Sequence, residues 1–238
     1  MKYITSTIKP AQRIMAIAAC VTVLFASACK KDQTNPLGED GVSTVIKDLQ
    51  GDIGASVGGS VPGKENRPFR DFYYNFDKKL QITDTAANKT TLNWDIAFTG
   101  IYNSFVYINS GTNPKSPGFG GQGQGVIVGI DTPYDQVNEA PTAEAMEQDN
   151  LTFVGMDKYP QLSNMGWYFY TLTTHIAQPI KNRTFVLKTA AGKYAKLELI
   201  SMYQGAPPTI TDLNWPAPYF TFRYFVQQDG SRNLRTSK

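Results

Sequence analysis

The residue types that build most reactive sites are scarce in this chain of 238 residues. It has a single histidine, His175, and two cysteines, Cys20 and Cys29. A metal site built from several histidines is therefore excluded, and a hydrolytic triad would have His175 as its only base. Paired carboxylates occur in most chains with this many acidic residues and favour no particular reaction. We predict a protein that is not an enzyme.

Both cysteines lie in or at the end of an N-terminal leader. An apolar run over residues 14–28 follows a basic start, and small residues directly precede Cys29. This pattern indicates a secretory signal peptide at residues 1–28 and acylation of the Cys29 thiol. The acylated mature protein would have no free thiol, which excludes catalytic cysteine, zinc–cysteine and iron–sulfur sites. A secreted protein cleaved nearby and an uncleaved anchor helix are the alternatives.

An excess of one charge is also absent from the predicted mature chain. The formal net charge of +3 reflects 23 Lys and Arg against 20 Asp and Glu, and three of the basic residues lie within the signal. No basic field remains to attract nucleic acid. Residues 29–63 are polar and glycine-rich, which predicts a flexible tether in which residues 42–49 dock as a strand or turn. Residues 64–238 are expected to form one folded domain.

Short runs of β-branched and aromatic residues dominate the rest of the chain. Strands are predicted within nine stretches, at residues 69–76, 92–98, 105–108, 126–130, 151–154, 167–172, 184–189, 194–203 and 219–226. The glycine of residues 190–193 predicts a hairpin turn, and helical periodicity is weak except over 142–147. Many short strands at short intervals indicate an all-β domain, a single antiparallel β-sandwich or open-barrel-like fold with long loops.

Two stretches allow more detailed expectations. On the strand at residues 92–98, alternation would place Trp94, Ile96 and Phe98 on one face, with Asp95 accepting hydrogen bonds. The pairing of Asp95 with Trp94 also resembles a sugar subsite. On the later hairpin, we expect Lys193 and Lys196 to be solvated.

Three ordered motifs resemble one known family. They are residues 92–98 with the glycine-rich residues 118–126, residues 182–189 leading into 192–197, and the closing strand 219–224. Behind a lipoprotein signal, this order resembles the HmuY family of haem-binding surface lipoproteins from Bacteroidetes-type bacteria. The resemblance extends from residue 69 to the C-terminus. It implies an HmuY-like all-β fold that grips haem or a related tetrapyrrole and passes it to a TonB-dependent outer-membrane receptor.

The resemblance also bears on the iron ligands. The best-known pattern in the family uses two axial histidines from separate loops, and this chain has one. His175 lies close to where the second ligand would fall, and Met156 and Met165 lie in the region that would supply the first. A thioether is a legitimate haem ligand, so Met/His or Met/Met ligation is expected, and tyrosinate ligation is the alternative.

Two other functions are consistent with the same sequence features. The protein could be a surface lipoprotein that binds carbohydrate or protein, or a relative that keeps the fold and has lost haem binding. We expect a lipid-anchored protein of the outer membrane exposed at the cell surface, with attachment to the inner leaflet as the alternative.

Overall fold

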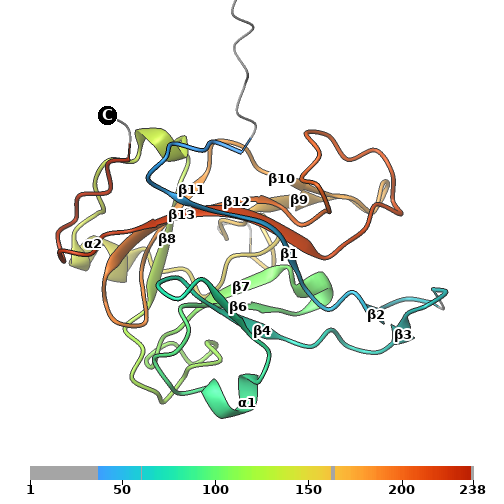
Figure 1. Ribbon diagram of the computed structural model, residues 1–238, viewed down its shortest axis with the longest axis horizontal. Helices are drawn as coiled ribbons and strands as arrows, with labels where there is room; N and C mark the ends of the chain where they lie inside the picture. Colours follow the sequence, from blue (N-terminus) through green and yellow to red (C-terminus); the bar gives the residue numbers. More distant parts are fainter. Residues whose placement is uncertain (1–36, 60, 162–163, 237–238) are drawn as a thin grey trace, which may run out of the picture. The chain divides into compact units, whose positions relative to one another are not determined.

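Two antiparallel sheets form the framework of the protein in a computed structural model that describes residues 37–59, 61–161 and 164–236. The predicted signal peptide and Cys29 lie outside these residues. The five-stranded sheet has the order β1-β13-β12-β11-β8, and the four-stranded sheet has the order β5-β4-β6-β7. In Figure 1 the first sheet lies above the second. This arrangement confirms an all-β sandwich, and neither sheet closes into a barrel.

Strands β7, β8 and β13 have the predicted bounds, whereas β2, β3, β5 and β10 lie outside the predicted runs. The five-stranded sheet contains β1 (Thr44–Gln50), β8 (Val126–Ile130), β11 (Thr184–Lys188), β12 (Tyr194–Ser201) and β13 (Tyr219–Val226). The four-stranded sheet contains β4 (Phe72–Asn75), β5 (Leu80–Ile82), β6 (Ile96–Thr99) and β7 (Phe105–Ile108). Two small sheets pair β2 (Ala55–Ser56) with β3 (Glu65–Asn66) and β9 (Tyr168–Tyr170) with β10 (Ala177–Pro179).

Helices are short in the described part of the chain. They are the α-helices α1 (Thr85–Asn88) and α2 (Ala143–Gln148) and the 3-10 helices η1 (Ile101–Asn103) and η2 (Tyr134–Gln136). The Thr142 side chain caps α2 by accepting a hydrogen bond from the Ala145 amide. The predicted strand at residues 151–154 is reduced to one bridge between Val154 and Val106.

The main core fills the space between the two sheets. Phe98 of β6 lies between Phe72 of β4 and Phe220 of β13, with ring centroids 4.8 Å apart for Phe72–Phe98 and 4.5 Å apart for Phe98–Phe220. Phe72 and Phe98 belong to one sheet and Phe220 to the other, so this aromatic stack joins the two layers. Such rings bury large apolar areas and dominate the energetics of a core.

Trp94 does not share the core face with Ile96 and Phe98, so that prediction is wrong. Its ring is fully buried in a separate cluster on the other face of the four-stranded sheet, 4.2 Å from the Tyr73 ring. Trp94 precedes the first residue of β6, so strand alternation does not govern its side chain. A buried indole also cannot stack on a sugar, and this removes the sugar subsite beside Asp95.

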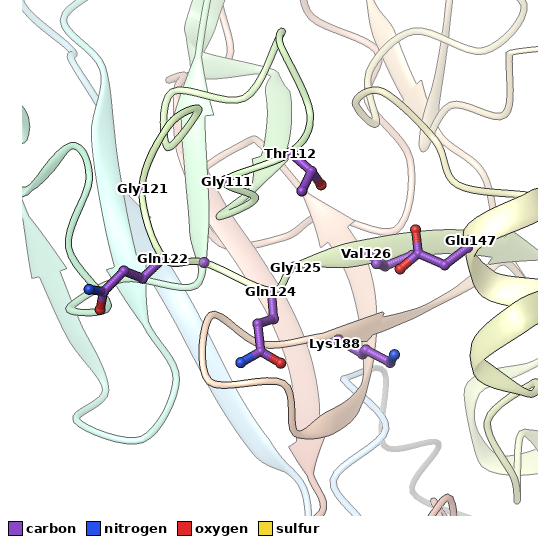
Figure 2. Close-up of a pocket in the computed structure, with 10 residues that line it drawn as sticks. Gly111, Thr112, Gly121, Gln122, Gln124, Gly125, Val126, Glu147 and Lys188 are labelled. Atoms are coloured by element: carbon purple, nitrogen blue, oxygen red, sulfur yellow. The ribbon is translucent and has the colours of Figure 1, made fainter.

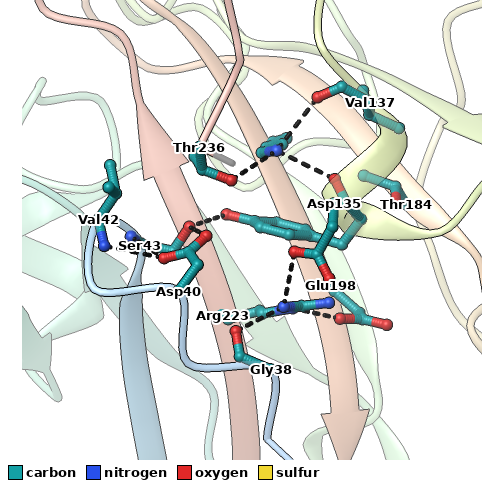
Figure 3. A network of polar contacts seen from close by, with 12 residues as sticks. Gly38, Asp40, Val42, Ser43, Asp135, Val137, Thr184, Glu198, Arg223 and Thr236 are labelled. Carbon is teal, nitrogen blue, oxygen red and sulfur yellow. Dashed lines mark hydrogen bonds and ion pairs between the residues drawn. The ribbon is translucent and has the colours of Figure 1, made fainter. Parts of the chain in front are cut away.

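Lys196 is fully buried, which contradicts the expectation that it is solvated. It belongs to β12, the central strand of its sheet, and η2 and the C-terminal residues cover that face. Its Nζ donates hydrogen bonds to the Tyr134 and Val137 carbonyls at 3.0 and 3.1 Å and to the Thr236 hydroxyl at 3.1 Å (Figure 3). Burial lowers the pKa of Lys196 from its usual 10.5 to about 8.

Arg223 lies in the same polar network. Its guanidinium pairs with Glu198 at 2.5 Å and Asp135 at 3.1 Å and donates to the Gly38 carbonyl (Figure 3). Arg223 Cζ and Lys196 Nζ each lie 4.2 Å from the centroid of the Tyr134 ring. Each cation therefore has both hydrogen-bond acceptors and an aromatic face, which is the condition under which charge is tolerated inside a protein.

Strand β1 lies within residues 29–63, the range predicted as a tether. The stretch at residues 42–49 was expected to dock, and it does so as β1, which pairs with β13 from Thr44 opposite Tyr224 to Gln50 opposite Tyr219. The folded part of the chain therefore includes this segment. Ile46 and Leu49 pack against the main core and provide the apolar contact that orders it.

Candidate functional site

The β9–β10 hairpin carries the single histidine of the chain. Residues 171–176 connect its strands, and the His175 amide donates to the Thr171 carbonyl at 2.9 Å. The hydroxyls of Thr171 and Thr174 lie 2.9 Å apart and close the same turn. His175 has a φ of 55°, a left-handed conformation that this bonded turn holds in place.

His175 makes its polar contact with Tyr170, the last residue of β9. The Tyr170 hydroxyl and His175 Nδ1 are 2.8 Å apart, and the two ring centroids are 6.1 Å apart. Both side chains are exposed, as is the neighbouring Leu172 at 80% of its accessible surface. The connection of the hairpin thus presents an exposed imidazole and, three residues earlier, an exposed leucine.

Phenol groups lie behind this pair. Tyr168 is buried, and its hydroxyl is 2.9 Å from the Ser104 hydroxyl. The hydroxyl of Tyr203 accepts a hydrogen bond from the Ala177 amide of β10 at 3.0 Å. Burial is the main cause that raises the pKa values of both phenols, and the nearby Tyr170 contributes in the same direction. These two phenols are therefore neutral at pH 7.

Met156 lies next to the hairpin. It forms a parallel bridge with Tyr168, and the Asp157 amide donates to the Tyr168 carbonyl at 2.9 Å. Its side chain is half-buried and packs against the main core. Residues bridged in this way point to the same side, so Met156, Tyr168 and Tyr170 share one face of the small sheet.

Met165 packs in a different place. Its sulfur lies so close to Gly129 of β8 that a Cβ built on that glycine would be 2.1 Å from Sδ. Gly129 therefore has to be a glycine for the methionine to pack there. Of the three predicted iron ligands, the structure puts His175 and Met156 on or beside the hairpin and gives Met165 a packing contact with β8.

Arg183 holds the segment that contains both methionines. Its guanidinium forms an ion pair with Asp157 and donates to the Gly166 carbonyl at 2.7 Å and to Asp131 at 2.6 Å. Asp157 in turn accepts a hydrogen bond from the Gly166 amide at 3.0 Å. Residues 157 and 166 are thus fixed to the start of β11. Arg183 lies in the sequence motif at residues 182–189. Its partners Asp131, Asp157 and Gly166 are distant in the sequence, so the motif alone does not reveal these contacts.

A concave surface lies at the glycine-rich loop. It is an open pocket of about 420 Å³ lined by Gly111, Thr112, residues 121–126, Glu147 and Lys188 (Figure 2). Gly123 packs directly on the buried Asn109, leaving no room for a Cβ, which explains why the loop is glycine-rich. The lining is polar, and no aromatic ring takes part in it.

Other candidate chemistry finds little support in the described residues. They contain no group of three or more His, Cys, Asp and Glu side chains placed to hold a metal ion. The sequence also contains Gly-x-Ser-x-Gly at residues 54–58, and its Ser56 is buried and donates to the Gly59 and Glu65 carbonyls. The only histidine pairs with Tyr170, so Ser56 has no base. Within the same residues, no helix has the length and apolar character needed to cross a membrane.

Together, the fold and the site define a two-sheet β-sandwich that presents a tyrosine–histidine pair on an exposed hairpin. The chain belongs to the HmuY family, because the family model described as HmuY protein matches residues 70–215. This confirms the resemblance found in the sequence motifs. No curated protein matches the chain.

Three solved bacterial proteins show some similarity to this chain. A candidate lipoprotein from Bacteroides fragilis NCTC 9343 is 16% identical, covering 65% of this chain and 81% of its own, with a TM-score of 0.33. A candidate HmuY-like heme binding protein from Bacteroides vulgatus ATCC 8482 is 14% identical, covering 66% and 84%, with a TM-score of 0.36. The apo HmuY analog of Tannerella forsythia is 13% identical, covering 78% and 95%, with a TM-score of 0.35.

Proposed function

We propose that this protein binds haem or a related tetrapyrrole at the β9–β10 hairpin and does not act as an enzyme. The observation that carries the proposal is the exposed Tyr170–His175 pair, which places an imidazole on the same connection as the exposed Leu172 in an HmuY-family domain. Imidazole is a common axial ligand of haem iron, and a porphyrin needs apolar surface around such a ligand. Membership of the HmuY family and the heme-binding description of the B. vulgatus protein support the same ligand.

We rank the three candidate iron ligands by where the structure places their side chains. His175 is the primary ligand because its ring is exposed on the hairpin. Met156 is the favoured second ligand because it shares the face of Tyr170, although its side chain would have to leave the edge of the core. Met165 is the third choice, since ligation would cost its contact with Gly129.

The wider setting is proposed from the sequence. A signal peptide at residues 1–28 and acylation at Cys29 would anchor the protein in the outer membrane, exposed at the cell surface. A TonB-dependent receptor of that membrane would then take the tetrapyrrole from the protein. Support comes from the leader pattern and from what HmuY resemblance implies.

An absorption titration with haemin tests the proposal directly. We expect a saturable Soret shift at one equivalent of haemin for the purified protein, weakened by His175→Ala, by Met156→Ala or by Met165→Ala. Tyr159→Phe is the matched control, because Tyr159 is exposed and its side chain makes no polar contact among the described residues. A spectrum identical to that of free haemin in the ferric and the reduced state would overturn the proposal.

Binding of a carbohydrate is the second candidate, and the polar pocket at the glycine-rich loop favours it. Glu147, Lys188, Gln122 and Gln124 supply the donors and acceptors that sugar hydroxyls need. Calorimetric titration with a panel of oligosaccharides would show heat that is lost in Lys188→Ala. Absence of heat across the panel would remove this candidate.

A further inference from the structure

The Tyr170–His175 contact leaves the two nitrogens of the imidazole in different surroundings. Nδ1 lies 2.8 Å from the Tyr170 hydroxyl, whereas no polar group of the described residues lies against Nε2. A neutral imidazole has one N–H donor and one unprotonated nitrogen, and only the unprotonated nitrogen can bind a metal. The Tyr170 hydroxyl can donate to Nδ1 or accept from it, so the direction of this hydrogen bond decides which nitrogen is free to act as a ligand.

Both ends of this contact are fixed by the backbone. Tyr170 is paired with Ala177 in the hairpin register, and the His175 amide is bonded to the Thr171 carbonyl. The Thr171 and Thr174 hydroxyls close the turn between them. A pair held in this way keeps its geometry without a bound ligand, which is the preorganisation that a binding site requires.

We propose that Tyr170 is a positioning residue whose hydroxyl oxygen accepts a hydrogen bond from His175 Nδ1–H, so that the Nε2 lone pair faces solvent as the iron ligand. This inference rests on the proposed haem binding and adds the residue that selects the ligating nitrogen. The phenol oxygen can accept this bond while its own proton donates elsewhere. Metal-binding imidazoles generally donate their second N–H to an oxygen in this manner.

The groups behind the pair are consistent with a neutral acceptor. Tyr168 and Tyr203 have pKa values raised chiefly by burial, so they carry no charge at pH 7 that would draw the imidazole proton away from Tyr170. Of the described side chains, only that of Tyr170 forms a hydrogen bond with the imidazole.

The single histidine makes the tautomer directly measurable. Nitrogen-15 NMR of the full protein without haem would report only two imidazole nitrogens, both from His175. We expect the Nδ1–H tautomer to dominate in the wild type. Tyr170→Phe keeps the ring and removes the hydroxyl, and it should return His175 to the Nε2–H tautomer that a free side chain favours. Tyr159→Phe should leave both resonances unchanged.

Haemin affinity gives the second readout. Tyr170→Phe should weaken binding by about 10- to 100-fold, the usual effect of losing the partner of a metal-binding imidazole. It should have no added effect in a His175→Ala background, because Tyr170 acts through His175. A double variant that binds more weakly than His175→Ala would show that Tyr170 contacts the porphyrin itself and would overturn the positioning role.

The two proposals fail in different ways. If the wild type gives a saturable Soret shift but the tautomer is the same with and without the Tyr170 hydroxyl, the inference is overturned and haem binding stands. If the wild type binds no haemin in either oxidation state, the proposed function is overturned, and with it the role of Nε2 as an iron ligand.

Discussion

Lys196 places a positive charge inside the five-stranded sheet, where its three hydrogen bonds replace the water it has lost. The sequence predicts a solvated lysine because lysine is usually exposed. What it cannot show is that η2 and the C-terminal residues, which are distant in the chain, cover this face of β12. A buried charge of this kind is costly to disturb, since its partners are left without a donor.

Replacing Lys196 with methionine should destabilise the protein at pH 7. The Val137 carbonyl would lose its donor and the Tyr134 carbonyl would keep only the Val137 amide at 3.3 Å, and an unsatisfied buried polar group costs about 1–3 kcal/mol. We expect urea denaturation of Lys196→Met to give a free energy of unfolding lower by about 2–4 kcal/mol. Lys193→Met is the control, because the Lys193 side chain is 31% exposed in its ion pair with Asp77. Equal losses in the two variants would contradict the structural role of Lys196.

The same residue should make stability depend on pH. Burial lowers the pKa of Lys196 in the folded protein to about 8, against 10.5 for the ordinary group. Between about pH 8 and pH 10.5, Lys196 is protonated in the unfolded chain and neutral in the folded protein. The contribution of Lys196 to the free energy of unfolding therefore becomes more favourable as the pH rises through this range. The advantage of the wild type over Lys196→Met in urea denaturation should therefore grow from pH 8 towards pH 10. A constant difference would contradict the depressed pKa.

Among the elements, the strands with clear local signals were predicted well. The hairpin of β11 and β12 has its glycine at the turn, and β13 has a long run of aromatic residues. Elements that depend on remote partners were predicted less well. The stretch at residues 151–154 has the composition of a strand, yet only Val154 finds a bridge partner. For the β9–β10 hairpin, the sequence predicted the first strand and not the second.

The candidate site was predicted in part for the same reason. His175 could be singled out because it is the only histidine. Its pairing with Tyr170 could not, because the contact depends on the register of a hairpin whose second strand, β10, contains a proline and has no strong pattern. The positions of Met156 and Met165 depend on the path of a loop that Arg183 holds from outside.

Removing the Arg183 clamp should free that loop. In Arg183→Leu the segment between Asp157 and Gly166 loses its ion pair and its carbonyl contact, so we expect trypsin to cleave several-fold faster after the exposed Lys158. Limited proteolysis followed by mass spectrometry measures this rate. Arg232→Leu is the control, since the ion pair of Arg232 with Glu139 is exposed on both sides. Similar cleavage in the wild type and Arg183→Leu would show that the loop is held by other contacts.

Across the whole molecule, Asp95 joins the two sheets. Its carboxylate accepts the Phe76 amide at 2.8 Å, beyond the end of β4, and the Ala190 amide at 3.0 Å, in the β11–β12 turn. The sequence predicted that Asp95 accepts hydrogen bonds, and the structure confirms it. That the two donors belong to different layers could not be foreseen, because a local pattern shows no contacts across a sandwich.

Loss of the Asp95 carboxylate should weaken the whole sandwich. Asp95→Ala leaves two amides without an acceptor in the interior, and we expect the free energy of unfolding to fall by about 2–5 kcal/mol in urea denaturation. Asp95→Asn keeps one acceptor oxygen and should lose less. Asp229→Ala serves as the control, because Asp229 is exposed and caps a surface turn. An Asp95→Ala variant as stable as this control would contradict the link between the layers.

The pairing of β1 with β13 has a mechanical consequence. Tension applied to the N-terminal segment would act on the bond between the Gly38 carbonyl and Arg223 and on the pairing of Thr44 with Tyr224. Because β1 is an edge strand, such a pull would peel it from the sheet one residue pair at a time. The remaining strands, and the β9–β10 hairpin with them, would carry load only after β1 had been released. Strand β1 is therefore the element expected to detach first under tension on the N-terminal segment, before the proposed binding site is strained.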